Sequence, residues 1–202
     1  MPITLNASTS SGLVTTPDNS GAIALQSNGT TQLTVSATGT YGQLKSGTET
    51  TTTSGTYVDF TGLPSWVKRI TLMINGVSFN GGSSNPTVQL GTSSGIVSSG
   101  YKSSAIYIGT STGGTGSNSG AGFTFYNWSG ASNTYDSVVV VSLVGSNTWM
   151  CSALFYEESN PGYQTVISGK VALGGTLDRI RFTTVSGADS LDAGSVNILY
   201  EG

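Results

Sequence analysis

Acidic side chains are the residues of this chain best suited to catalysis. The chain has no histidine, so it lacks the usual base that activates a serine or cysteine nucleophile. Cleavage of a glycan needs two carboxylates about 5–10 Å apart, and Glu157 and Glu158 are neighbours in the sequence. They stand at the end of a predicted strand, directly before a turn at 159–162. We interpret them as a solvated strand end, and we predict no catalytic residue.

Metal ligands are sparse. Asp189 and Asp192 lie in the segment GADSLDAG at 187–194, and their carboxylates could bind Ca²⁺ together with backbone carbonyls. Aspartate often caps its own turn in such a segment, and we prefer that role here. The single cysteine, Cys151, lies in the middle of a predicted strand, where a buried thiol is typical. One cysteine without histidine does not make a zinc site, so we predict neither a metal nor a cofactor.

Four aromatic residues stand close together at 123–128. Phe123 and Phe125 share one face of a predicted strand, and we expect both in the core. Tyr126 and Trp128 follow where this strand ends, next to polar loop residues. Exposed Tyr and Trp rings can stack on a sugar while their polar atoms form hydrogen bonds. The alternative for Trp128 is a structural role, in which its ring closes one end of the protein.

Two uncharged segments frame these aromatic rings. The run from 103 to 135 contains no charged residue, and Gly, Ser, Thr and Asn dominate 110–120 and 127–133. Removing water from hydroxyl and amide groups costs less than removing it from charges, so such loops suit a neutral glycan. We therefore predict a receptor-binding or glycan-binding surface on these two loops. Its predicted contact residues are Tyr126, Trp128 and Asn133.

Alternation of apolar and polar residues predicts strands throughout the chain from residue 57 onward. Ile70, Leu72 and Ile74 fall on one face of their strand, whereas the β-branched run at 138–141 is typical of a strand covered on both faces. The predicted strands are 57–60, 69–74, 87–90, 105–108, 122–126, 137–144, 148–156, 164–171, 179–184 and 195–200. No helical period is found, and this many strands with short turns predict an all-β, jelly-roll-like sandwich of two sheets.

Charge is scarce in this sequence. The chain has 202 residues, a net charge of −3 and 8% charged residues, where about 25% is usual. Nucleic-acid binding needs a basic surface, and a membrane span needs about 18 consecutive apolar residues; we find neither, and we predict no nucleic-acid partner and no membrane span. A surface with so little charge suits a protein that works in an assembly.

The first 40 residues differ from the rest. Two short runs of alternating apolar residues flank Asn28-Gly29, and this arrangement is a strong signal for a β-hairpin. A lone hairpin is only marginally stable in water, so it needs another surface to pack on. We predict a short extended or hairpin anchor that attaches or oligomerises the protein. Its predicted contact residues are Leu13, Ile23, Leu25, Leu33 and Val35.

These patterns divide the chain into three parts. The anchor occupies 1–40, a Thr-rich linker with almost no apolar residue occupies 41–56, and a β-sandwich domain occupies 57–202. Threonine favours an extended backbone in the linker. The last part holds every strong strand and nearly all the aromatic residues, so we expect it to fold alone.

Three segments carry a resemblance to a known class of proteins. The stretch SGLVTTPDNSGAIALQSNGTTQLTVSATG resembles a short module of tailed-bacteriophage fibre and virion-decoration proteins. The segments SLDAGSVNILYE and VDFTGLPSWVKRITLMINGV are similar to the closing strand and the opening of small β-domains in the same class. The resemblance covers both ends of the chain and the start of the main domain, and it includes no catalytic signature.

The resemblance implies a virion structural protein that is made in the host bacterial cytoplasm and assembles as a homotrimer. Its N-terminal segment would bind other virion proteins. The favoured function is a tail fibre or fibre tip that contacts a glycan on the host surface. The first alternative is a capsid decoration protein that stabilises the head or projects from it. A fibre enzyme that degrades glycans is the minor alternative.

Overall fold

The computed structural model describes residues 23–27, 30–36, 39–40, 44–82, 84–109, 114–126, 130–131, 133–158 and 162–202, the first three ranges by their backbone alone. Leu13 and Trp128, two of the predicted contact residues, lie outside these ranges. The chain forms two compact units, Met1–Gln43 and Leu44–Gly202. In the described ranges the regular elements are all β-strands, and no helix there is long and apolar enough to cross a membrane.

The first unit contains a small antiparallel sheet. Strand β1 (Ile23–Ser27) pairs with β2 (Thr30–Ser36), and β2 pairs with β3 (Gly39–Thr40). The register places residue 23 opposite 35 and residue 25 opposite 33. The pairing of β1 with β2 confirms the predicted hairpin.

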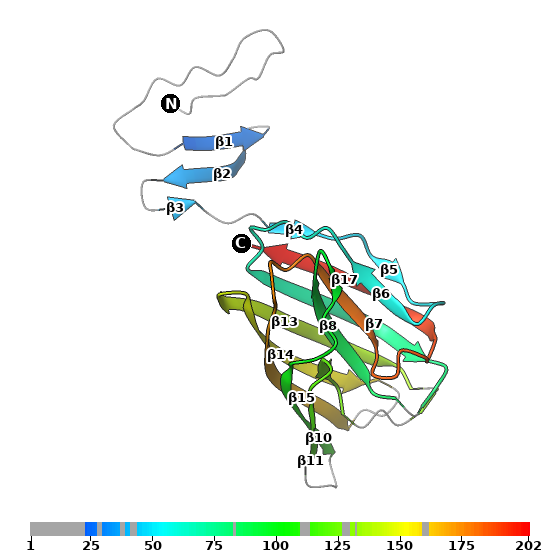
Figure 1. The fold of residues 1–202 in the computed structure, drawn as a ribbon. Helices are drawn as coiled ribbons and strands as arrows, with labels where there is room; N and C mark the ends of the chain where they lie inside the picture. The colour runs from blue at the N-terminus through cyan, green and yellow to red at the C-terminus, as the bar shows by residue number, and fades with distance from the viewer. Residues whose placement is uncertain are drawn as a thin grey trace. The chain divides into compact units, whose positions relative to one another are not determined.

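The second unit is an all-β sandwich of two antiparallel sheets, as predicted (Figure 1). The larger sheet has the strand order β11 (Thr115–Ser119), β10 (Lys102–Gly109), β15 (Tyr163–Ala172), β14 (Thr148–Glu157), β13 (Tyr135–Gly145), β7 (Arg69–Phe79), β17 (Leu191–Glu201) and β4 (Leu44–Ser46), and β5 (Thr50–Thr51) also pairs with β17. The smaller sheet has the order β12 (Phe123–Thr124), β8 (Pro86–Thr92), β16 (Arg179–Thr184) and β6 (Tyr57–Phe60), and β9 (Gly95–Ile96) pairs with β8. The chain passes repeatedly from one sheet to the other.

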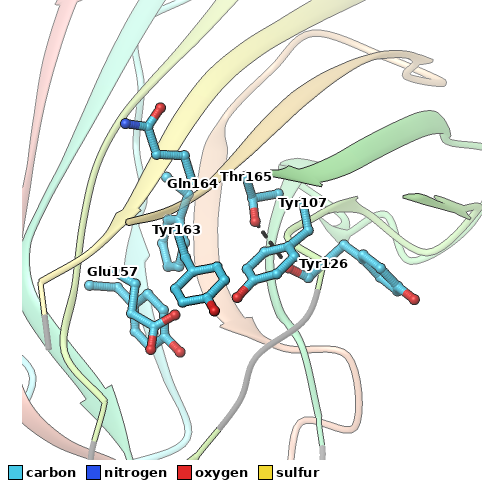
Figure 2. Close-up of a pocket in the computed structure, with 8 residues that line it drawn as sticks. Tyr107, Tyr126, Glu157, Tyr163, Gln164 and Thr165 are labelled. Atoms are coloured by element: carbon cyan, nitrogen blue, oxygen red, sulfur yellow. Dashed lines mark hydrogen bonds between the residues drawn. The ribbon is translucent and has the colours of Figure 1, made fainter. Parts of the chain in front are cut away.

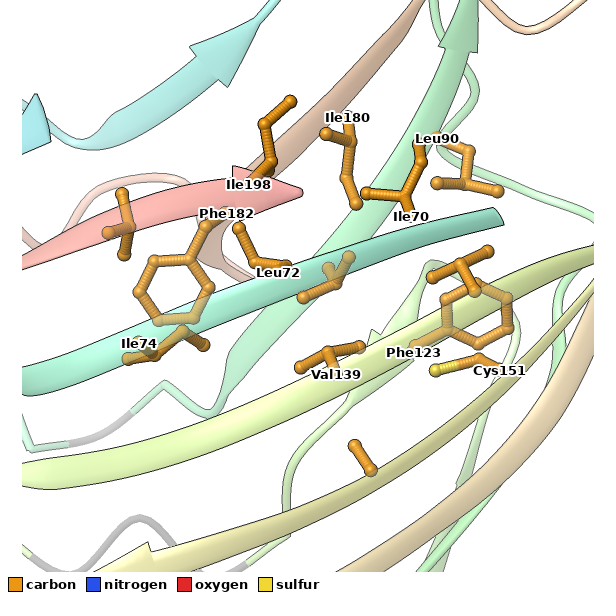
Figure 3. Close-up of a cluster of buried hydrophobic side chains, with 14 of the residues drawn as sticks. Ile70, Leu72, Ile74, Leu90, Phe123, Val139, Cys151, Ile180, Phe182 and Ile198 are labelled. Carbon is orange, nitrogen blue, oxygen red and sulfur yellow. The ribbon is translucent and has the colours of Figure 1, made fainter. Parts of the chain in front are cut away.

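The core lies between the two sheets and follows the predicted alternation. Ile70, Leu72 and Ile74 point inward from β7, and Phe123 and Phe125 are buried as predicted. Figure 3 shows the side chains from both sheets that surround them, which include Leu90, Val139, Cys151, Ile180, Phe182 and Ile198. Trp149 is also a core residue, as its position in a predicted strand suggested, and it is 2% exposed.

Two ion pairs of the sandwich join neighbouring strands. Arg181 on β16 donates two hydrogen bonds of 2.7 Å to the carboxylate of Asp59 on β6, and its guanidinium lies 4.0 Å from the centre of the Tyr57 ring. Arg69 on β7 forms an ion pair with Glu201 on β17 at 3.2 Å. The hydrogen bonds to Asp59 raise the pKa of Arg181 further, so this guanidinium keeps its charge.

The predicted linker at 41–56 differs from the structure. Leu44–Ser46 and Thr50–Thr51 form β4 and β5, which pair with β17, and the compact unit begins at residue 44 instead of 57. Thr52, the residue directly after β5, is fully buried, and its backbone N–H donates to the Gly194 carbonyl at 2.9 Å. Polar residues can form these strands because backbone hydrogen bonds to β17, more than apolar burial, hold them.

Two further expectations are corrected. In the run 138–141, Val139 and Val141 are buried but Val138 is 54% exposed, because the larger sheet packs on the smaller one with its inner face only. The predicted loop 110–120 contains the edge strand β11, which pairs with β10. Its five residues carry no apolar side chain, so the sequence contains no alternation to predict it.

Candidate functional site

A small pocket lies at one end of the sandwich, where β10 ends and β15 begins (Figure 2). Tyr107 and Thr165 are register partners on these two strands, and both face inward with the core residues that precede and follow them. Tyr126 comes from the other sheet, two residues after β12. The complete lining is Tyr107, Tyr126, Tyr135, Phe155, Glu157, Tyr163, Gln164 and Thr165.

Stacked rings form the walls of the pocket. The rings of Tyr107 and Tyr163 lie parallel, with centroids 5.2 Å apart and planes inclined by 7°. They meet because Tyr163 is the register partner of Gly109, two residues beyond Tyr107, and such diagonal neighbours are within reach of aromatic side chains. Deeper inside, Phe155 stacks on Tyr135 at 4.8 Å and tilts against Phe125 at 4.2 Å. The surface rings therefore rest on a continuous aromatic base.

Polar contacts tie the neighbouring loops to this end of the sandwich. Thr165 Oγ1 donates to the Tyr126 carbonyl oxygen at 3.0 Å (Figure 2). Asn133 Nδ2 donates to Glu157 Oε1 at 2.6 Å and also approaches the Tyr135 hydroxyl at 3.3 Å. Tyr126 and Asn133 are thus both hydrogen-bonded to residues that line the pocket.

The interpretation of Glu157 and Glu158 as a solvated strand end is only half right. Glu158 is exposed, as expected, but Glu157 is 3% exposed and accepts the hydrogen bond from Asn133. Residues alternate between the two faces of a strand, so the last residue of β14 points into the sandwich and only the next one reaches water. A buried carboxylate requires hydrogen-bonding partners, and Asn133 provides one.

The pocket is too small to enclose a sugar. Its free volume is about 10 Å³, which is close to the minimum for a single water molecule. The rim is better suited to ligand contact than the cavity, because Tyr107, Tyr126 and Tyr163 are each partly exposed there and Gln164 is exposed. Glu157 is the one carboxylate among the described lining residues, whereas glycoside hydrolysis normally uses two. The arrangement is suited to contact with a planar or saccharide surface through ring faces and an amide.

The three predicted contact residues fare differently. Tyr126 lines the pocket, and Asn133 lies beside it but uses its amide to bind the pocket wall. Trp128 lies outside the described residues. The prediction missed Tyr107 and Tyr163, which the β10–β15 register brings together although 55 positions separate them in the sequence. The sequence shows a tyrosine near the end of one strand and another at the start of the next, but it does not show that these two strands pair.

Other candidate sites contribute little to this picture. Within the described ranges no group of three or more His, Cys, Asp or Glu side chains could hold a metal ion. Asp192 accepts a hydrogen bond from the Ser78 hydroxyl on the neighbouring strand β7. Cys151 is buried, as predicted, and burial raises the pKa of its thiol to about 12. This thiol is therefore neutral at physiological pH and a poor nucleophile.

Burial of Cys151 predicts a loss of stability in alkaline solution. The pKa rises from 9.0 in the unfolded chain to about 12 in the fold, so the stabilising contribution of the neutral thiol is complete below pH 9 and is lost as the pH rises towards 12. At pH 10.5 this loss is about 2 kcal/mol. Tyr101, whose hydroxyl accepts from the Leu90 N–H at 2.7 Å and whose pKa burial also raises to about 12, adds to it.

Urea unfolding at pH 8 and pH 10.5 measures this loss. Cys151→Ala leaves Tyr101 in place, so we expect the variant to lose about 2 kcal/mol less than the natural chain between the two pH values. An identical loss in both chains would show that the thiol titrates as freely in the fold as in the unfolded chain.

A comparison with protein-family models finds no match to this sequence, and a comparison with curated proteins finds no relative.

Proposed function

We propose that this chain is a structural protein of a tailed-bacteriophage virion, a tail fibre or fibre tip that contacts a neutral glycan on the host surface. The observation that supports host contact is the gathering of partly exposed Tyr107, Tyr126 and Tyr163 at one end of the sandwich. The virion assignment rests on the resemblance of the N-terminal and C-terminal segments to phage proteins. The resemblance also implies that the protein is a homotrimer that binds other virion proteins through its N-terminal segment.

The physical case for a neutral glycan comes from the chemistry of this end. Aromatic faces stack on the apolar faces of sugar rings, and amides bind sugar hydroxyls without a charge. The uncharged run from 103 to 135 includes Tyr107 and Tyr126. One aromatic contact contributes on the order of 1 kcal/mol, so several copies held together would bind through avidity. The proposal is therefore a weak site that is repeated in an assembly, without catalysis.

Binding of the purified full chain to immobilised bacterial surface polysaccharides tests this proposal. We expect Tyr126→Ala and Tyr163→Ala each to weaken binding about fivefold per site, because each removes one ring contact of about 1 kcal/mol. Tyr57→Ala is the matched control, since this tyrosine is half exposed on β6 and does not line the pocket. We expect the control to bind normally.

Two results would contradict host contact at this end. One is equal binding by all three variants. The other is a loss of binding that parallels a fall in melting temperature, because such a loss would come from unfolding and not from the missing ring. Capsid decoration is the alternative, because a protein that covers a shell also needs apolar contacts, and Val138, Leu154 and Val166 are exposed on one sheet. Electron microscopy of virions labelled with an antibody to this chain separates the two functions by tail or head labelling.

A further inference from the structure

The outer face of the larger sheet carries large apolar side chains in water. On β10, β15, β14 and β13 the inward-facing residues are core residues, whereas Ile106, Val166, Leu154 and Val138 face outward and are 48%, 44%, 50% and 54% exposed. Only 8% of the residues of the chain are charged, so little charge repulsion opposes contact between these side chains and those of another molecule. Contiguous exposed apolar groups usually mark an interaction surface.

The strand register joins these four side chains into one line. Ile106 is the partner of Val166, Val166 is the partner of Leu154, and Leu154 is the partner of Val138. Adjacent strands lie about 4.8 Å apart, so the line crosses four strands without interruption. We call these four residues the aliphatic row. Met73 on β7, the partner of Val138, continues the row and is half-buried.

Charges of opposite sign lie on the two sides of the aliphatic row. On one side Lys102 and Lys170 are register partners, each four residues from the row on its own strand. Neither lysine forms an ion pair with a described acid, and both line a shallow groove of about 680 Å³ that has no acidic residue in its lining. Four residues of strand correspond to roughly 13 Å.

The other side of the row is acidic. Glu158 is exposed directly after the end of β14, four residues beyond Leu154, and Asp136 lies two residues before Val138 on β13. The exposed hydroxyl residues Ser104, Ser152 and Ser168 fill the space between the row and the two lysines. The face thus has a basic side, an apolar centre and an acidic side.

We propose that a second copy of this chain packs on this face, related to the first by a twofold axis along the aliphatic row. A rotation about that axis superimposes the row of one copy on the row of the other and turns each basic side towards the acidic side of its partner. The basic groove of one copy would then receive the region of Glu158 from the other. A surface that is complementary to itself forms such twofold pairs. This inference concerns assembly and does not depend on host contact or on a place in a virion.

The mass of the purified full chain in solution tests the proposal. A twofold contact predicts an even multiple of the 20.6 kDa monomer mass. This holds if the contact forms a dimer, and it also holds if the contact pairs two trimers that another segment of the chain holds together. Leu154→Lys places a charge in the apolar centre, and we expect it to halve the mass measured by light scattering. Val166→Lys should also halve the mass, and it tests the same contact if Leu154→Lys fails to fold. Val185→Lys is the matched control, because this valine is 49% exposed outside the larger sheet.

A charge exchange tests the orientation of the two copies. We expect Lys170→Glu to weaken the pair at least tenfold, and the double variant Lys170→Glu with Glu158→Lys to restore it, since both changes together reverse one contact without adding net charge. Three outcomes would overturn the proposal: a monomeric natural chain, an unchanged mass in both lysine variants, or the same halving in Val185→Lys. Far-UV circular dichroism and melting curves verify that each variant is folded.

Discussion

Phe155→Ala is expected to lower the free energy of unfolding by about 3–5 kcal/mol, as truncation of a buried aromatic residue usually does. Phe155 is 4% exposed, and its ring contacts Phe125 at 4.2 Å and Tyr135 at 4.8 Å. Alanine would leave a cavity where the two sheets meet and would remove both ring contacts. For a chain of this size the melting temperature should fall by roughly 6–20 °C.

Urea unfolding followed by tryptophan fluorescence measures this loss. Val144→Ala on β13 is the control, since Val144 is 66% exposed and a surface change of this kind usually stays within about 0.5 kcal/mol. Phe155 also supports the pocket wall, so the variant should lose glycan binding together with stability. Equal stability of the two variants would show that Phe155 does not belong to the core between the sheets.

The central strands could be predicted because burial of one face of a strand requires apolar and polar residues to alternate along the sequence. The strands β6 and β16 begin and end where the pattern predicted, at Tyr57–Phe60 and Arg179–Thr184. In β7 the alternation of Ile70, Leu72 and Ile74 is the direct result of one face that is buried. The structure extends several strands by a few residues, because backbone pairing continues beyond the last apolar side chain.

The edge strands could not be predicted in the same way. β4, β5 and β11 contain Leu44 as their single large apolar residue, and it is 60% exposed. Strands of this kind are specified by a neighbouring edge that offers free N–H and C=O groups. Such an edge exists only in the folded sheet, so the sequence of the strand itself holds no signal for it.

The candidate site contains residues of both kinds, some that the sequence pattern predicts and some that only the folded sheet brings together. Tyr126 could be assigned from its place at the end of an aromatic strand, but its neighbours Tyr107 and Tyr163 come from other strands. Only the register of β10 with β15 places them face to face. Glu157 illustrates the same limit, because a carboxylate next to a turn is usually solvated, and its burial depends on the distant Asn133 amide.

Because the sandwich starts at residue 44, a chain that starts at residue 57 should be less stable. A chain that covers 57–202 lacks β4, β5 and the buried Thr52, and it leaves that edge of β17 unpaired. It loses the hydrogen bonds from the Gly47 N–H to the Ile198 carbonyl and from the Thr52 N–H to the Gly194 carbonyl, at 2.7 and 2.9 Å. The Thr52 hydroxyl bond to the Ala193 carbonyl, at 2.5 Å, is lost as well. The Gly55 and Thr56 carbonyls are also absent, and they accept from the Leu191 N–H and the Thr183 hydroxyl, both at 2.7 Å.

We therefore expect 57–202 to be less stable than 44–202 by about 5 kcal/mol, at about 1 kcal/mol for each of these five hydrogen bonds. Thr52→Val in the longer chain keeps the shape of the buried side chain and removes only its hydroxyl, so it should account for about a fifth of this loss. The exposed edge of β17 should also make the shorter chain aggregate sooner, since unpaired edges recruit other strands. Urea unfolding of both chains measures the difference, and equal stability would return residues 44–56 to the role of a linker.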